Sequence, residues 1–191
     1  MSSLVCLLEE PSAKAMLTNV LEKIVPDSIA IRYIVFDGKQ DLEKQIERKL
    51  RGWNQPSSYF LIMRDQDSGN CHEIKANLLS KVESAGKKNV SLVRIACHEL
   101  ESFYLGDLLA VENGLDITGL TKNQNNRKYR TPDNLSNPAE ELSKLTKKKY
   151  QKVSGSRAIG PFLKLDNSNK SVSFNVLVEG VKKLIELEIE Q

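Results

Sequence analysis

Carboxylates that follow three short apolar runs are the side chains best suited to chemistry in this sequence. They are Glu9 and Glu10 after LVCLL, Asp65 and Asp67 shortly after YFLIM, and Glu99 and Glu101 after VSLVRIA. Several carboxylates cannot share one site at neutral pH without a counter-charge or proton uptake. Mg²⁺ (or Mn²⁺) supplies such a charge, and Mg²⁺ takes carboxylate, water and phosphate oxygens as ligands. The predicted chemistry is a metal-assisted reaction at a phosphate, in which the ion activates a water and stabilises the leaving oxygen.

Apolar runs that alternate with helical periodicity predict how these carboxylates are positioned. The predicted strands and intervening helices cover, in order, residues 4–8, 11–26, 29–36, 41–50, 59–63, 74–86 and 90–96. Such alternation predicts an α/β fold with a mainly parallel four-stranded sheet and helices on both faces. Ligands and catalytic groups gather beyond the carboxyl ends of parallel strands. A single acidic residue at a strand end usually caps the helix that follows. Three acidic sites at one edge of the sheet are harder to explain as helix caps.

The second half of the chain has a different character. Residues 115–137 are polar and predict a long loop, and a helix is expected from 137 towards Lys147–Lys149. A turn is expected at 154–156 and a final amphipathic helix at 174–189. We therefore divide the chain into an α/β core at 1–114, a polar and basic insertion with a helix at 115–153, and a C-terminal turn and helix at 154–191. The last part is expected to pack back on the core within one structural domain.

Composition excludes several classes of protein. The 191 residues are 40% hydrophobic, with 28 Lys and Arg against 25 Asp and Glu, which is too apolar and too balanced for a disordered chain. No apolar run reaches the roughly 18 residues of a membrane span, and no basic leader precedes Glu9, so we expect no signal peptide. Cys6, Cys71 and Cys97 are odd in number and widely spaced, which favours reduced thiols over disulfides or a zinc site. A cytoplasmic protein is expected.

A basic stretch lies at 122–152, with nine Lys or Arg against three acidic residues. One interpretation is a nucleic-acid surface, with phosphate contacts and with Tyr129 and Tyr150 stacking on bases. The other is a solvated insertion whose charge maintains solubility. Arg157 suits a phosphate, or it pairs with a carboxylate and pins the C-terminal segment. The candidate nucleic-acid-binding residues are Arg127, Lys128, Arg130, Lys147, Lys148, Lys149 and Arg157.

An early strand that ends in Glu9, followed two strands later by Asp65-x-Asp67, resembles the Toprim domain of topoisomerases, primases and nucleases of the overcoming-lysogenization-defect (OLD) group. The wider chain resembles an uncharacterised bacterial family of Toprim-like proteins that are often encoded beside ABC-type ATPases. The matching stretches span nearly the whole chain: LLEEPSAKAML, FLIMRDQDSG, RIACHELESFYLGD and SGSRAIGPFLKLDNSNKSVSF.

The resemblance implies a Toprim-like (Rossmann-like) fold with a helical C-terminal extension. It implies Mg²⁺- or Mn²⁺-dependent cleavage of DNA or RNA, with an ABC-type ATPase partner and a role in phage defence. Glu9 becomes a general acid/base or metal ligand, with Glu10 beside it. Asp65 and Asp67 become the catalytic metal-binding pair, and Glu99 and Glu101 become second-site ligands.

The chain departs from the Toprim pattern in two places. Toprim domains usually have Gly after the first Glu, whereas this chain has Glu10 and Pro11, and the position four after Glu9 is Ala13 instead of an acidic residue. These departures leave open a full two-metal site, and they leave open a non-catalytic Toprim-fold adaptor or regulatory subunit of an ATPase complex. A phosphoacceptor receiver domain ranks last, because the chain lacks Lys-Pro after a fifth strand and is too long.

Overall fold

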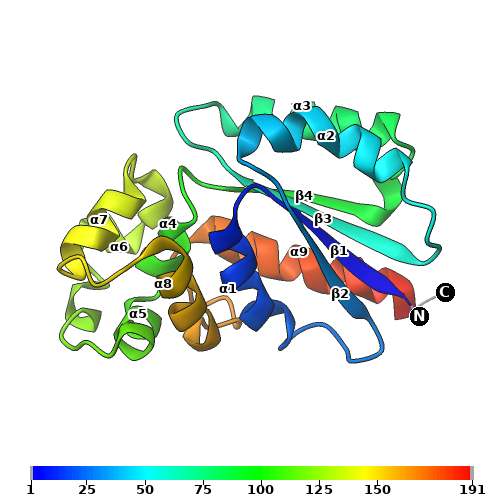
Figure 1. Cartoon of the computed structure of the whole chain (residues 1–191). Helices are drawn as coiled ribbons and strands as arrows, with labels where there is room; N and C mark the ends of the chain where they lie inside the picture. The colour runs from blue at the N-terminus through cyan, green and yellow to red at the C-terminus, as the bar shows by residue number, and fades with distance from the viewer. Residues whose placement is uncertain (1, 190–191) are drawn as a thin grey trace.

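One parallel sheet organises the structure, a computed structural model that describes residues 2–189. The strands β1 (Ser3–Leu8), β2 (Ala30–Val35), β3 (Ser58–Asp65) and β4 (Ser91–Ala96) pair in the order β2-β1-β3-β4 (Figure 1). Leu8 pairs with both Val35 and Met63, and Asp65 pairs with Ala96. The strands therefore end together at one edge of the sheet. The predicted parallel four-stranded α/β sheet is confirmed.

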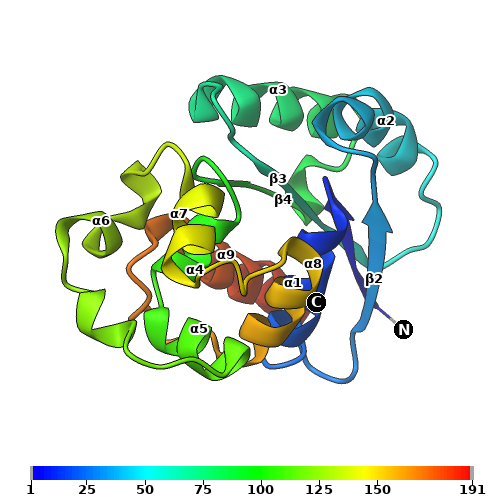
Figure 2. The same ribbon diagram turned by 60° about the vertical axis from the view of Figure 1, so that its left-hand side comes forward.

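Helices cover both faces of the sheet and its carboxyl edge. They are α1 (Pro11–Leu21), α2 (Lys39–Arg51), α3 (Cys71–Ser84), α4 (Glu101–Leu105), α5 (Leu108–Leu115), α6 (Arg127–Arg130), α7 (Pro138–Leu145), α8 (Lys152–Ile159) and α9 (Val172–Ile189), with 3₁₀ turns η1 (Lys88–Val90), η2 (Thr121–Asn123), η3 (Pro132–Asn134) and η4 (Gly160–Phe162). Helices α2 and α3 lie on one face, and α1 and α9 lie on the other. Residues 101–162, which we call the helical cap, gather beyond the carboxyl ends of the strands (Figure 2). No helix within residues 2–189 is long and apolar enough to cross a bilayer.

Two apolar cores result from the alternation of side chains along the strands. On β1, Val5 and Leu7 pack in the core under α2 and α3, whereas Leu4, Cys6 and Leu8 pack in the larger core on the opposite face. All five side chains are essentially inaccessible to solvent. A strand buried on both faces explains why LVCLL is a continuous apolar run.

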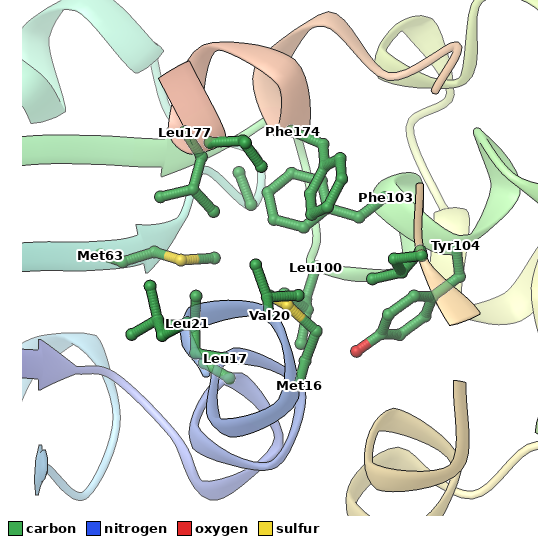
Figure 3. Close-up of a cluster of buried hydrophobic side chains, with 14 of the residues drawn as sticks. Met16, Leu17, Val20, Leu21, Met63, Leu100, Phe103, Tyr104, Phe174 and Leu177 are labelled. Atoms are coloured by element: carbon green, nitrogen blue, oxygen red, sulfur yellow. The ribbon is translucent and has the colours of Figure 1, made fainter. Parts of the chain in front are cut away.

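The larger core joins the helical cap to the sheet. Side chains from α1, α4 and α9 meet there, and the Phe103 and Phe174 rings lie 5.2 Å apart between centroids (Figure 3). Tyr104 is buried beside Phe103, with its hydroxyl directed away from that ring. Because the cap and α1 share this core, the position of the cap over the strand ends is set by apolar packing.

The C-terminal half differs from the sequence prediction in two segments. The long loop expected at 115–137 is wrong in part, because this segment contains η2, α6 and η3. The turn expected at 154–156 is wrong, because these residues lie inside α8. Gly155 serves close packing instead of a turn, since a Cβ there would lie 2.4 Å from the Tyr150 ring. The final helix is confirmed as α9.

Close packing of α5 on α8 gives a test of the cap. A Cβ at Gly114 would lie 2.6 Å from the Ala158 carbonyl oxygen and 2.7 Å from Ile159 Cα, and backbone atoms cannot swing aside. We predict that Gly114→Ala lowers the free energy of unfolding by about 1–3 kcal/mol, measured by urea denaturation. In the control Gly52→Ala, the nearest atom is a backbone oxygen at 3.3 Å, and a change below about 0.5 kcal/mol is expected. Equal stability of both variants would contradict the packing.

Candidate functional site

Four carboxylates meet at the carboxyl ends of β1 and β3, under the helical cap. These residues, Glu9, Glu10, Asp65 and Glu101, are called the acidic cluster below. Glu9 Oε2 accepts a hydrogen bond of 2.9 Å from the backbone N–H of Asp65. Burial raises the pKa of Asp65 well above its ordinary value, and the charges of Glu10, Glu101 and Glu9 raise it further. The structure therefore brings together four of the six carboxylates that the sequence singled out.

Glu101 is the most buried member of the acidic cluster. Its side chain is inaccessible to solvent, and its Oε1 accepts a hydrogen bond of 2.9 Å from the Tyr150 hydroxyl. Its Oε2 is buried without a hydrogen-bond partner in the described chain, as is the hydroxyl of Tyr104. Burial raises the pKa of Glu101, although the Tyr150 bond and the charge of Lys152 oppose the rise. An unsatisfied buried acceptor costs about 1–3 kcal/mol, so this oxygen favours a proton or a cation.

Two cations balance part of the negative charge. Arg64 is buried on β3, with its Nε 3.9 Å from Glu9 Oε2 and one Nη 3.6 Å from Asp67 Oδ2. Lys152 of α8 places its Nζ 2.7 Å from Glu10 Oε2. Sequence reasoning missed both. Arg64 could have been found, because it directly follows an apolar run and a buried cation requires a partner. Lys152 could not, because nothing in the local sequence connects it with Glu10, 142 positions away.

The two remaining predicted carboxylates lie beside the cluster and have other partners. Asp67 has a left-handed backbone (φ 54°) and pairs with Lys39 of α2 at 2.6 Å. Burial raises the pKa of Glu9 most, and the charge of Asp67 raises it further. The hydrogen bond from the Asp65 N–H and the charge of Arg64 oppose this rise. Glu99 Oε2 accepts a hydrogen bond of 2.8 Å from the backbone N–H of Ala139, in the first turn of α7. A carboxylate at a helix N-terminus is stabilising, so Glu99 anchors α7 in this structure.

The acidic cluster fits a divalent cation in donor chemistry, but its side chains are engaged otherwise. Among the side chains that the structure describes, in residues 2–186, no three His, Cys, Asp or Glu are arranged to hold a metal ion. Hard cations take carboxylate oxygens, and the unpartnered Glu101 Oε2 is an oxygen of that kind. Glu10, however, accepts hydrogen bonds from Ser12 and Lys152. Binding of an ion therefore requires Glu10 to exchange these partners for it.

The predicted nucleic-acid-binding residues occupy three places on the helical cap. Arg127, Lys128 and Arg130 lie on α6, the three lysines lie in the turn after α7, and Arg157 lies on α8; all are exposed. Lys128 pairs with Glu141 at 3.1 Å, and Lys149 Nζ donates to the Asp116 carbonyl at 3.0 Å. The other five form no ion pair among the residues placed by the structure. Their charges are therefore available to a ligand.

The predicted stacking of Tyr129 and Tyr150 on bases is wrong. Both rings are buried, because they fill the core of the helical cap. The Tyr129 hydroxyl donates to Glu141 at 2.8 Å, and the Tyr150 hydroxyl donates to Glu101. These tyrosines fix acidic side chains instead of offering a flat surface to nucleic acid.

The chain matches the profile described as Domain of unknown function (DUF4276) over residues 8–182, which includes the whole acidic cluster. The chain belongs to the DUF4276 family. No curated protein matches it.

Comparison with solved structures finds a similar fold in the C-terminal region of the Burkholderia pseudomallei OLD protein. The identity is 15% and the TM-score is 0.59, over 97% of this chain and 98% of that chain. At this identity the likeness concerns the fold. It confirms the Toprim-like architecture that the sequence predicted for this member of the DUF4276 family.

The raised pKa of Asp65 predicts how stability depends on pH. Between its unfolded and folded pKa values the folded protein binds more protons, so the free energy of unfolding falls as pH rises through that window. We predict that Asp65→Asn, in EDTA, becomes progressively more stable than the parent as pH rises from about 4. Each tenfold difference in the proton affinity of Asp65 between the folded and the unfolded parent adds about 1.4 kcal/mol to the difference in stability between the two proteins. Urea denaturation across a pH series measures this.

The control is Asp166→Asn. Hydrogen bonds from Ser168 lower the pKa of the exposed Asp166, so this variant should lose stability relative to the parent as pH rises. An Asp65→Asn difference that is independent of pH would contradict the electrostatic description of the cluster.

Proposed function

We propose that the chain is a Toprim-like nuclease that hydrolyses phosphodiester bonds with Mg²⁺ or Mn²⁺. The observation that best supports this is the acidic cluster, where Asp65 and Glu101 are buried together and Glu101 Oε2 has no hydrogen-bond donor in the described part of the chain. A bound divalent ion activates a water and stabilises the leaving oxygen. Asp65, Glu10 and Glu101 would hold the ion, with Asp67 and Glu99 as the outer candidates from the sequence.

Glu9 is placed to move a proton. Its Oε2 is held by the Asp65 N–H and lies near Arg64, which leaves Oε1 to accept or return the proton. Burial raises the pKa of Glu9, and general acid/base groups work best when their pKa approaches the operating pH. Arg64 is held by the Glu43 carboxylate and the Asp65 carbonyl, and its charge opposes the rise in the pKa of Glu9.

Nucleic acid, an ATPase partner and phage defence belong to the same proposal. The exposed cations Arg127, Arg130 and Arg157 and the lysines at 147–149 lie on the helical cap, where they suit phosphate contacts. The resemblance to the OLD group supports an ABC-type ATPase as partner and phage defence as the role. The free cysteines Cys6, Cys71 and Cys97 suit the cytoplasmic location expected from the sequence.

A second candidate function is a non-catalytic adaptor or regulatory subunit of an ATPase complex. Asp65 and Glu101 are 7% and 0% exposed, and Glu10 already forms an ion pair with Lys152. Ala13, where many Toprim nucleases have an acid, is buried in the larger core. A phosphodiester reaches these carboxylates only if the helical cap moves, so a permanently closed cap would leave an inert Toprim fold.

Cleavage assays test the nuclease directly. We predict that the purified chain, incubated with its ATPase and Mn²⁺ or Mg²⁺, cuts single- or double-stranded DNA or RNA, and that EDTA stops the reaction. Asp65→Asn and Glu9→Gln should each lower the rate by at least about 10²-fold, because both remove a carboxylate from the reacting site. Glu83→Gln, an exposed carboxylate that pairs with Lys88, is the matched control and should keep full activity. Intact substrates under all these conditions would support the adaptor.

Salt dependence tests the nucleic-acid surface. We predict that Lys147→Gln/Lys148→Gln weakens binding to a single-stranded oligonucleotide. It should reduce the slope of log K against log salt by about 1.4, since each phosphate contact on a single strand contributes about 0.7. Fluorescence anisotropy in EDTA measures the affinity and its dependence on salt. The control is Lys49→Gln/Lys183→Gln, two exposed lysines on α2 and α9. Equal slopes for the parent and both variants would favour the solvated insertion.

A further inference from the structure

The open edge of β4 is a surface outside the acidic cluster. In the described chain β4 pairs only with β3, at the end of the sheet. The Ala96 carbonyl accepts a hydrogen bond from the Gln66 N–H, so the backbone groups of Ala96 face β3. Backbone groups point to alternate sides along a strand, so those of Val93 and Ile95 face the open side. Arg94 satisfies the Val93 carbonyl at 2.9 Å. Unpaired backbone groups on an edge strand are a template for another strand.

A groove runs along this edge, between α3 and α9. It has a volume of about 520 Å³, and its lining includes Val93 and Ile95 of β4, which lie beside α3 in the smaller core. On the α9 side, Val172 and Val176 are 66% and 47% exposed. They are one helical turn apart and so share a face of α9. The groove therefore offers apolar contacts on both sides of an unpaired strand edge.

Cations surround the groove and lack acidic partners. Lys75, Arg94, Arg130 and Lys170 line it, and none of them forms an ion pair in the part of the chain that the structure describes. Among the described residues of the lining, the one carboxylate is Asp133. It accepts hydrogen bonds from the Ser171 hydroxyl at 2.6 Å and from the Ser173 N–H at 2.7 Å. Excess positive charge beside apolar side chains selects a ligand that is both acidic and apolar.

We propose that this groove binds an acidic, extended segment of a partner polypeptide, which adds to β4 as a fifth strand. The backbone of the segment would hydrogen-bond to the open edge of β4, and its alternate apolar side chains would contact Val172 and Val176. Its acidic side chains would pair with the four cations. A second copy of this chain fits poorly, because it would bring the same cations face to face. Nucleic acid would satisfy the cations but would leave the strand edge and the valines unused.

The test uses a fluorescein-labelled, acetylated and amidated octapeptide of alternating Glu and Val, titrated with the full chain in EDTA. We expect saturable binding that weakens with salt. Lys75→Glu/Lys170→Glu should lower the affinity at least about tenfold. Lys49→Glu/Lys183→Glu, an equal charge change outside the groove, should lower it by less than about threefold. Circular dichroism checks that both variants are folded.

A second peptide isolates the backbone contribution without changing the protein. N-methylation of alternate residues blocks one edge of the peptide as a strand donor, and the isomer methylated on the other residues blocks the opposite edge. One isomer should lose at least about tenfold in affinity, because strand addition depends on main-chain hydrogen bonds. Equal affinity of both isomers and the parent peptide would overturn the proposal. Absence of binding to the octapeptide would also overturn it.

Discussion

Crowding of carboxylates in a buried site is the constraint on which much of this structure depends. The parallel register delivers Glu9 and Asp65 to one edge of the sheet, and α4 adds Glu101 directly beyond β4. Like charges at low dielectric raise one another's pKa and destabilise the folded state. Arg64, Lys152 and the hydroxyl of Tyr150 offset part of that cost. The unpartnered oxygen of Glu101 shows that the compensation is incomplete.

The helical cap explains how the compensation is delivered. Tyr150 and Lys152 come from the start of α8 and the residues before it, and they reach the cluster because α8 packs on α1 and α5. Glu99 in turn holds the first turn of α7, so the acidic end of β4 and the cap position each other. On our proposal Glu10 would exchange its ion pair with Lys152 for a divalent ion. Lys152, which offsets part of the negative charge of the acidic cluster, would therefore compete with the ion.

The sheet could be read from the sequence because its signals are local. Continuous apolar runs such as LVCLL predict strands buried on both faces, and the acidic residues after them were correctly placed at one edge. The cap was harder to predict. Gly155 looked like a turn because its role, room for the Tyr150 ring, is a tertiary contact. Tyr129 and Tyr150 looked like stacking residues because basic neighbours surround them in sequence. Their burial comes from tertiary contacts in the larger core, such as that of the Tyr150 ring with Tyr104 of α4. Lys152 had no local signal for its partner Glu10.

Isothermal titration of the full chain with Mn²⁺ measures whether the acidic cluster holds a divalent ion. We expect the parent to bind Mn²⁺ with release of protons, because carboxylates must ionise to bind, and we expect Asp65→Asn to bind at least about tenfold more weakly. Glu83→Gln should bind as the parent does. Absence of binding heat in several buffers, or identical binding by the parent and Asp65→Asn, would show that the acidic cluster is not a divalent-ion site.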